Sequence, residues 1–90
     1  MIQEKFEKKI LITNKLGLHA RAAAKFVKVS DGLESRVTVR FGSHTVSGSS
    51  ILGLMSLAAN KGSVIRVKCG GNSPSKDLAC ILELIKNNFG

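Results

Sequence analysis

The sequence predicts an α+β fold in which a four-stranded antiparallel sheet carries three helices on one face, in the order βαββαβα. Three observations point to it. Some runs alternate apolar with polar residues, others place apolar residues at helical spacing, and clusters of Gly, Ser, Asn and Pro separate the runs. The 90 residues suffice for a single domain, residues 1–90, with a modest aliphatic core. Because the helices cover one face, the other face of the sheet is expected to be polar.

The first strand and the first helix lie on either side of a loop that contains glycine. A strand is predicted in which Phe6, Lys8, Ile10 and Ile12 alternate with Glu7, Lys9, Leu11 and Thr13, and it is expected to end at Asn14-Lys15. The loop Leu16-Gly17-Leu18 follows. A helix is predicted from Ala20 to Ser30, with Asp31-Gly32 as its stop. Its core-facing stripe has residues at helical spacing: Ala23, Phe26, Val27 and Ser30.

A β-hairpin is predicted next. The segment Arg36–Phe41 alternates cleanly and places Val37, Val39 and Phe41 inward. Gly42-Ser43 is typical of a two-residue hairpin turn. The chain then returns as the short strand His44–Val46.

The second half of the chain contributes two helices and one strand. A short helix is predicted over Ile51–Ala59, ended by Asn60-Lys61-Gly62, and a strand over Val64–Cys69. Gly70-Gly71-Asn72 is expected to turn the chain. Ser73-Pro74 suits the start of a last helix. The buried stripe of this helix is predicted to comprise Leu78, Ile81, Leu82, Ile85 and Phe89.

The short middle helix has more apolar residues than one core face needs. Its expected core face comprises Ile51, Leu54, Leu57 and Ala58. Leu52 and Met55 are also apolar, and they lie three apart on a different stripe. A surface helix with apolar residues on two sides suggests a patch that docks a partner. The alternative is a helix that lies deeper in the core than its length suggests.

The chain is strongly basic. Fourteen Lys and Arg stand against six Asp and Glu, which gives a net charge of +8 and favours acidic partners. Nucleic acid is not expected among them, because the chain has no Tyr or Trp and no basic strand interleaved with aromatics. A solvated surface that faces an acidic protein explains the charge equally well. Half of the basic residues lie in the first third of the chain: Lys5, Lys8, Lys9, Lys15, Arg21, Lys25 and Lys28.

Several classes of site and location are not expected. Apolar runs are too short for a transmembrane helix and the N-terminus lacks a signal-peptide core, so a cytoplasmic protein without membrane contact is predicted. Cys69 and Cys80 have no neighbouring Cys or His in a metal-binding spacing. We expect no metal and no disulfide, and interpret both cysteines as small buried side chains. His44 is expected to be an exposed hairpin residue.

The segment Gly17–Ala23 is the main candidate for a functional site. His19 follows a glycine-containing loop, Arg21 comes two positions later, and an alanine-rich helix begins between them. Helix N-termini attract anions, because their first N–H groups are unpaired and carry partial positive charge. A neutral imidazole at such a place can act as a nucleophile toward a phosphoryl group. The alternative is a histidine that only caps the helix or packs beside it.

Two segments resemble a known family. Asn14-Lys15-Leu16-Gly17-Leu18-His19-Ala20-Arg21 resembles the active-site signature of HPr, the histidine phosphocarrier of the bacterial phosphotransferase system. Ser49-Ser50-Ile51-Leu52-Gly53-Leu54-Met55-Ser56-Leu57 resembles the second signature of the family, around its regulatory serine. The separation of the two segments and the order βαββαβα also match. The resemblance covers nearly the whole chain and implies the HPr-like open-faced sandwich.

The resemblance implies a role for each matching residue. HPr-like proteins accept a phosphoryl group from Enzyme I, which draws it from phosphoenolpyruvate, and pass it to an EIIA-type protein. His19 matches the residue that carries the group on Nδ1, and Arg21 matches the arginine that supports the phosphoryl oxygens. Ser50 matches the target of HPr kinase/phosphorylase. The positions expected to dock partners are Ile51, Leu52, Met55 and Lys28. The protein is thus expected to be a monomeric, stoichiometric carrier without a cofactor, rather than an enzyme.

The chain also departs from the family pattern. Ala22 stands where the family usually has proline, and it restores a backbone donor that proline lacks. Ser49 stands where a lysine is frequent, so Ser49 or Ser47 remains an alternative to Ser50 as the kinase target. The segments around Ala22 and Ser50 look more like HPr of regulatory, nitrogen-related systems. The alternatives are a carrier for sugar uptake and a docking module that works without phosphorylation.

Overall fold

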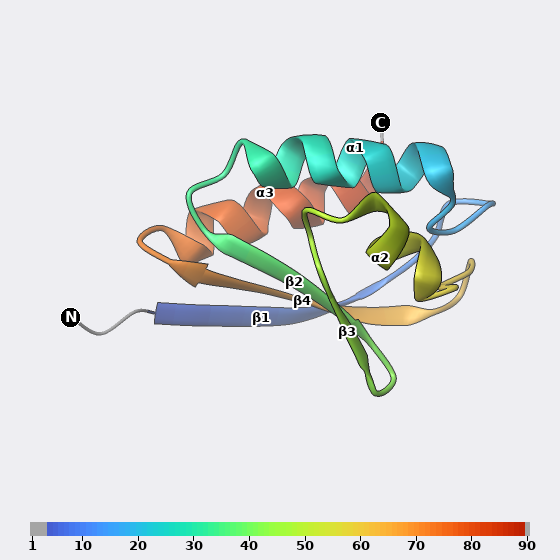
Figure 1. Ribbon diagram of the computed structural model, residues 1–90, viewed down its shortest axis with the longest axis horizontal. Helices are drawn as coiled ribbons and strands as arrows, with labels where there is room; N and C mark the ends of the chain where they lie inside the picture. The colour runs from blue at the N-terminus through green and yellow to red at the C-terminus, as the bar shows by residue number, and fades with distance from the viewer. Residues whose placement is uncertain (1–3, 90) are drawn as a thin grey trace.

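The computed structural model describes residues 4–89. Its four strands and three helices follow in the predicted order βαββαβα, which confirms the α+β fold (Figure 1). The elements, in chain order, are β1 (Glu4–Leu11), α1 (Ala20–Asp31), β2 (Arg36–Phe41), β3 (His44–Ser47), α2 (Ile51–Ser56), β4 (Val64–Gly71) and α3 (Pro74–Lys86).

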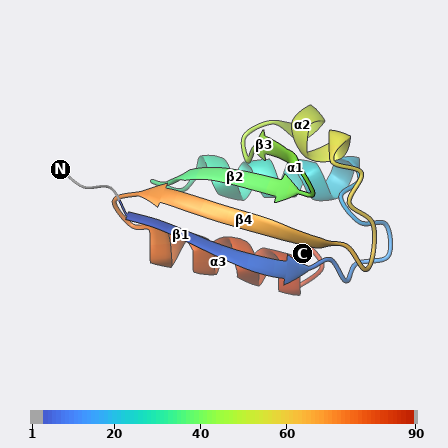
Figure 2. The same ribbon diagram turned by 90° about the horizontal axis from the view of Figure 1, so that it is seen from below.

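The four strands form one antiparallel sheet in the order β1-β4-β2-β3. The long helices α1 and α3 lie side by side over one face of the sheet, and α2 packs against α1 and β3 (Figure 1). Seen from below, the opposite face of the sheet is in front, α1 and α3 lie behind it, and α2 lies beside the β3 edge (Figure 2). The sheet thus has one packed face and one open face, as the sequence predicts.

The core lies between the helices and the packed face of the sheet. Phe26 of α1 and Ile81 of α3 are completely buried, as are Val39 and Val67 in the two central strands. Burying a side chain of this size contributes about 1.5–3 kcal/mol, so these residues hold both helices on the sheet. The predicted stripes of α1 and α3 and the inward positions of β2 are largely confirmed, although Phe41 is only half-buried.

The helix α2 is shorter than the sequence suggests. It ends at Ser56, not at Ala59, and Ala58 takes a φ of 54°. Leu57 and Ala59 are both buried, but two residues that far apart in a helix point in nearly opposite directions. The chain must therefore leave the helix to bury both. Of the predicted core face only Leu54 and Leu57 are buried, whereas Ile51 and Ala58 are exposed.

Other boundaries also differ from the prediction, and α1 and β3 each extend one residue further, to Asp31 and Ser47. Strand β1 ends at Leu11, three residues before Asn14, since the next backbone bonds go to the loop before β4. Gly70 and Gly71 belong to β4 rather than to a turn, because Gly70 pairs with both Lys5 and Arg36. Phe89 is buried, but it lies beyond the end of α3. There the chain turns back through positive φ values at Asn88 and Phe89.

The two cysteines differ in environment. Cys69 is completely buried in β4, and its burial raises the pKa of the thiol to about 11. Cys80 is exposed on α3, so the prediction that both are buried was wrong for it. The buried residues of α3 include Leu78 and Ile81, and position 80 falls outside their stripe. Both cysteines are free.

Within residues 4–89 no group of three or more His, Cys, Asp or Glu side chains is arranged to hold a metal ion. Over the same residues, no helix has the length and apolar character needed to cross a membrane.

Candidate functional site

The loop before α1 is held in one conformation from both sides. Asn14 Nδ2 donates a hydrogen bond of 2.8 Å to the carbonyl of Gly17, and the Gly17 N–H donates one of 3.2 Å to the carbonyl of Asn14. The next amide, that of Leu18, donates to the carbonyl of Ala59 at 2.9 Å. The loop is thereby tied to the segment that follows α2.

Gly17 is required at its position for two reasons. Its φ is 65°, in the left-handed region that side chains rarely adopt. A Cβ placed on it would also collide with the carbonyl oxygen of Ala59 and lie 2.7 Å from the Cα of Asn60. The glycine of the first signature thus lets two backbone segments meet, and that contact sets where the next residues lie.

His19 is the N-cap of α1. Its backbone is extended, with φ −82° and ψ −179°, and its carbonyl accepts the Ala23 N–H at 2.9 Å. Its Nδ1 accepts the Ala22 N–H at 3.1 Å. A backbone N–H can only donate, so this hydrogen bond requires Nδ1 to be unprotonated and puts the proton of the neutral ring on Nε2. His19 therefore does cap the helix, and the capping atom is the nitrogen with the free lone pair.

The surroundings of His19 suit an anion. A shallow hollow beside the ring contains three basic side chains, those of Lys15, Arg21 and Lys61. The first turn of α1 has no acidic residue. Of its first four N–H groups, those of Ala22 and Ala23 bond to His19, while Ala20 and Arg21 have no intrahelical acceptor. The dipole of α1 and the three basic side chains thus place positive potential on the same side of the His19 ring.

Sequence reasoning missed part of this hollow. Lys61 enters it because Gly62 and Ser63 exchange backbone hydrogen bonds of 2.8 Å with Ile12, which brings the turn before β4 to the loop before α1. The C-terminal turn adds Asn88, which accepts a hydrogen bond of 2.8 Å from the Thr13 hydroxyl, and Phe89. No local pattern marks these residues. Leu16, which is 65% exposed, also lines the hollow.

Ser50 is the N-cap of α2. Its Oγ accepts the Gly53 N–H at 2.9 Å, and its carbonyl accepts the Leu54 N–H at 3.0 Å. Ser50 is half-buried, whereas its neighbour Ser49 is exposed. The hydroxyl that matches the regulatory position is therefore at the start of a helix, as the sequence suggests, and it takes part in starting that helix.

The second apolar stripe of α2 faces solvent. Leu52 is 80% exposed, Ile51 40% and Met55 38%, so the alternative of a deeply buried helix is wrong. We call these three residues the α2 apolar patch. Because α2 packs against α1, the patch and His19 belong to the same side of the fold. Lys28 is exposed on α1, but it lies about 14 Å along the helix axis from His19, so the structure does not bring it into the hollow.

Comparisons with known proteins agree with this geometry. The family model described as the PTS HPr component phosphorylation site matches residues 6–87. The chain is 41% identical to the phosphocarrier protein HPr of Xylella fastidiosa over 92% of its own length and 93% of that protein. It is 34% identical to the phosphocarrier protein NPr of Shewanella violacea, covering 94% of this chain and 93% of that one.

Solved structures extend the comparison to the fold. A crystal structure of HPr from Thermoanaerobacter tengcongensis has a TM-score of 0.89 at 35% identity and covers 94% of this chain and 96% of its own. Another structure from the same organism, described as an HPr dimer, has a TM-score of 0.75 at 36% identity, with coverage of 90% and 93%. With the family model matching nearly the entire sequence, the chain belongs to the HPr family of phosphocarrier proteins.

Proposed function

We propose that this chain is a cytoplasmic, monomeric carrier that takes a phosphoryl group from Enzyme I onto Nδ1 of His19 and passes it to an EIIA-type protein. One observation carries the proposal: Nδ1 lies at the N-terminus of α1, 3.1 Å from the Ala22 amide. The Lys15, Arg21 and Lys61 side chains surround the same hollow. A nucleophilic lone pair and the donors that would receive a phosphoryl dianion thus share one place.

Uptake uses the Nδ1 lone pair as the nucleophile. A bond forms between Nδ1 and phosphorus while the bond between phosphorus and Enzyme I breaks, and the electrons of that bond remain with Enzyme I. As Nδ1 bonds to phosphorus it can no longer accept from Ala22. The Ala22 N–H is then free to donate to a phosphoryl oxygen, together with the unpaired amides of Ala20 and Arg21. The Arg21 guanidinium neutralises part of the new charge.

Release of the phosphoryl group to the acceptor requires that the surrounding donors stabilise it only in part. Arg21 is exposed and has no ion-pair partner among residues 4–89, so its contact with the phosphoryl group is screened by solvent. The hollow is open rather than enclosed, which leaves phosphorus accessible to the nucleophile of the acceptor protein. The chain then returns to its starting state without net change, which makes it a stoichiometric carrier rather than an enzyme.

The test uses 32P-labelled phosphoenolpyruvate and a catalytic amount of Enzyme I. The proposal requires label to reach about one phosphoryl group per chain and to be lost in acid but kept in base, as phosphohistidine is. A chain that binds Enzyme I and takes up no label would instead be a docking module. Light scattering of the same sample is expected to give a monomer, and a dimer at micromolar concentration would overturn that part of the proposal.

The downstream role is proposed to be regulatory, with a nitrogen-type EIIA as acceptor. The proposal rests on Ala22 and on the segment around Ser50. Sugar uptake is the second candidate, favoured by the relatives named HPr, which are more similar to this chain than the relative named NPr. The test offers both EIIA types to the labelled chain in separate reactions. Faster transfer to the nitrogen type supports the first role, and faster transfer to the sugar type supports the second.

The Ala22 amide provides a sharper test of how the group is held. Ala22→Pro removes the only donor to Nδ1 that the structure records. A hydrogen bond to a charged oxygen is stronger than one to a neutral nitrogen by about 1 kcal/mol, so the substitution should lower the equilibrium phosphorylation of His19 about fivefold. Ala22→Gly keeps the N–H and is expected to behave like the unchanged chain. Equal phosphorylation of all three proteins would exclude a role for this amide.

Ser50 is proposed as the target of HPr kinase/phosphorylase. A phosphate there would add nearly two negative charges beside the α2 apolar patch, where Enzyme I is proposed to dock. Ser50→Asp keeps an N-cap and adds one charge, and it should lower kcat/KM for phosphorylation by Enzyme I about tenfold. Thr45→Asp, on the open sheet face, is the matched charge control and should have little effect. A decrease of the same size in both variants would point to net charge instead.

The phosphorylated serine itself can be located with the kinase and ATP. Ser50→Ala should take up no label, whereas Ser49→Ala should be labelled like the unchanged chain. Label that persists in Ser50→Ala and disappears in Ser49→Ala would move the site to the exposed neighbour.

A further inference from the structure

The open face of the sheet gathers basic side chains that the proposed carrier function does not use. Strand register places on this face every second residue of β1, β4 and β2, opposite in direction to the buried Val37, Val39 and Val67. Its charged members are one carboxylate, Glu7, and the basic side chains of Lys5, Lys9, Arg36, Arg40, Arg66 and Lys68. We call these six the basic sheet face. They account for most of the excess positive charge of the chain.

Like charges stand directly opposite one another in this face. Lys9 pairs with Arg66 across β1 and β4, and Arg66 pairs with Arg40 across β4 and β2, so three cations form one row. Like charges directly opposite one another in such cross-strand pairs destabilise a sheet. The fold does not require a row of cations there, since the next row across the same three strands combines Glu7 and Lys68 with the neutral Thr38.

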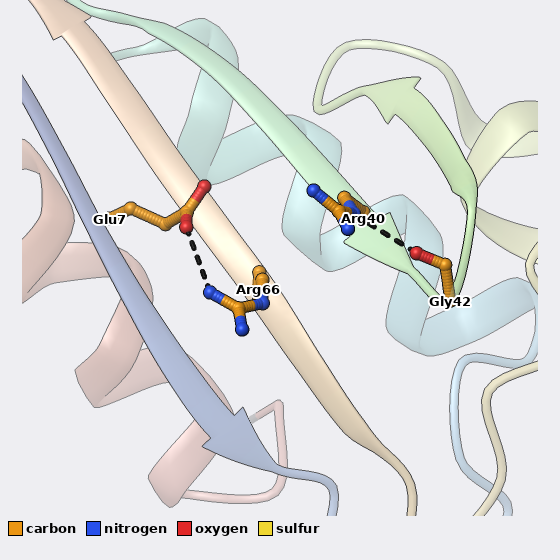
Figure 3. Close-up of polar contacts among 4 residues, drawn as sticks. All are labelled: Glu7, Arg40, Gly42 and Arg66. Carbon is orange, nitrogen blue, oxygen red and sulfur yellow. Dashed lines mark hydrogen bonds and ion pairs between the residues drawn. The ribbon is translucent and has the colours of Figure 1, made fainter.

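Few of these cations are neutralised by the side chains that the structure describes. Glu7 Oε1 lies 3.1 Å from Arg66, and this is the ion pair that the structure records among residues 4–89 (Figure 3). Arg40 instead donates from Nε to the carbonyl of Gly42 at 2.9 Å (Figure 3). Lys5, Lys9, Arg36 and Lys68 are exposed. Most of the basic sheet face therefore remains available to an outside anion.

The shape and the apolar residues of this face suit a protein partner. A shallow hollow between the strands is lined by Lys9, Arg40, Gly42, Val64 and Arg66. At the same end of the face, Leu11 and Val64 pair in register and are 49% and 50% exposed. Apolar side chains bordered by arginine are typical of protein interfaces, and the guanidinium fork binds carboxylates in a bidentate way.

We propose that the basic sheet face docks a partner protein through a surface rich in Asp and Glu. Charge complementarity carries the proposal, and the Glu7–Arg66 pair shows a carboxylate already bound on this face. Nucleic acid fits less well, because the described strands present no aromatic side chain there on which bases could stack. A planar membrane fits less well because the sheet is twisted (Figure 2).

This surface is separate from the one around His19. When the open face is viewed, α1, which begins at His19, lies behind the sheet, and α2, which bears the α2 apolar patch, lies beside the β3 edge (Figure 2). A partner on the sheet would therefore leave the helix side free for phosphoryl transfer. The proposal does not depend on the carrier function, because binding can be measured on the unphosphorylated chain.

The test is a titration of the 15N-labelled chain with a 20-residue poly-L-glutamate peptide, followed by NMR at moderate salt. We expect amide shifts on β1, β4 and β2. The triple variant Lys9→Gln, Arg40→Gln, Arg66→Gln should bind about tenfold more weakly, by analogy with coupling energies of charged interface pairs. The control variant Lys8→Gln, Lys76→Gln, Lys86→Gln has the same net charge as the first triple variant, but its changes lie outside this face. It should bind the peptide less than about twofold more weakly than the unchanged chain.

Several outcomes would overturn the proposal. Equal weakening in both triple variants would show attraction to net charge alone, and shifts confined to the helices would place the anion elsewhere. The same titration with a 20-base-pair DNA duplex or with phosphatidylserine vesicles must give weaker binding to this face. Comparable or tighter binding would make nucleic acid or membrane the partner. If the first triple variant does not fold, Lys5→Gln, Arg36→Gln, Lys68→Gln is measured instead, with the same expectation.

Discussion

Replacing His19 by alanine is expected to abolish phosphoryl uptake from Enzyme I, by at least about a thousandfold, because the nucleophile itself is lost. The same change removes the side-chain cap from the Ala22 amide, which should lower the free energy of unfolding by about 1 kcal/mol. The variant should therefore stay folded and remain able to bind Enzyme I through the α2 apolar patch. The measurement is the initial rate of labelling from phosphoenolpyruvate, with circular dichroism as the check on folding.

His44 provides the matched control for this prediction. It is the other histidine of the chain, and it is exposed at the start of β3, beside the hairpin turn. His44→Ala should label at the rate of the unchanged chain. A His19→Ala protein that still accepts the phosphoryl group in an acid-labile form would show that His19 is not the acceptor.

Gly17→Ala is the substitution expected to cost the most stability. The methyl group would be forced into a left-handed backbone, which costs about 1–2 kcal/mol. It would also collide with the carbonyl of Ala59, and overpacking of this kind costs about 1–3 kcal/mol more. We expect the free energy of unfolding to fall by about 3 kcal/mol, a large fraction of the stability of a small domain. Phosphoryl uptake should fall as well, since the loop places His19.

Gly42→Ala separates the cost of the left-handed backbone from the cost of the collision. Gly42 has a φ of 62°, close to that of Gly17, but an added Cβ would meet no atom within 4 Å. It should therefore show the backbone cost alone, about 1–2 kcal/mol, and should leave phosphoryl uptake unchanged. Urea unfolding of both variants gives the comparison. If Gly17→Ala is destabilised no more than Gly42→Ala, the contact with Ala59 does not set the loop as argued.

Local chemistry explains why much of the fold was predictable. The alternation in Arg36–Phe41 and the Gly42-Ser43 turn define β2 with the boundaries that the structure shows, because pleat and turn are both properties of neighbouring residues. The stripes of α1 and α3 follow from helical spacing in the same way. The end of α2 does not, since it depends on the need to bury Leu57 and Ala59 together against the rest of the fold.

The difference between local pattern and contacts of distant segments also applies to the site. His19 and Arg21 were predictable because the loop, the cap and the first helical turn are contiguous in sequence. Lys61 and Asn88 were not, because backbone bonds between Ile12 and the turn before β4, and a reversal after α3, bring them in from distant segments. The basic sheet face is of this kind as well. Its residues come from three strands, and only the register of those strands shows that Lys9, Arg66 and Arg40 form one row.

The structure shows what alanine does at position 22, where the family usually has proline. In the sequence it is a departure from the usual proline. In the structure its N–H holds the ring nitrogen that the resemblance implies is phosphorylated, at 3.1 Å. The departure thus adds a donor at the centre of the site, and it fixes which nitrogen of the neutral ring has the free lone pair.

The most direct test of the central proposal is to locate the phosphorus atom on the phosphorylated chain. After uniform 15N labelling and phosphorylation by Enzyme I, a long-range 1H–15N NMR spectrum of the imidazole distinguishes the two ring nitrogens. We predict that phosphorus is bonded to Nδ1 of His19, the atom that accepts the Ala22 amide in the unphosphorylated protein. Phosphorus bonded to Nε2 or to another residue, or a chain that carries no phosphorus, would contradict the proposal that Nδ1 of His19 is the acceptor.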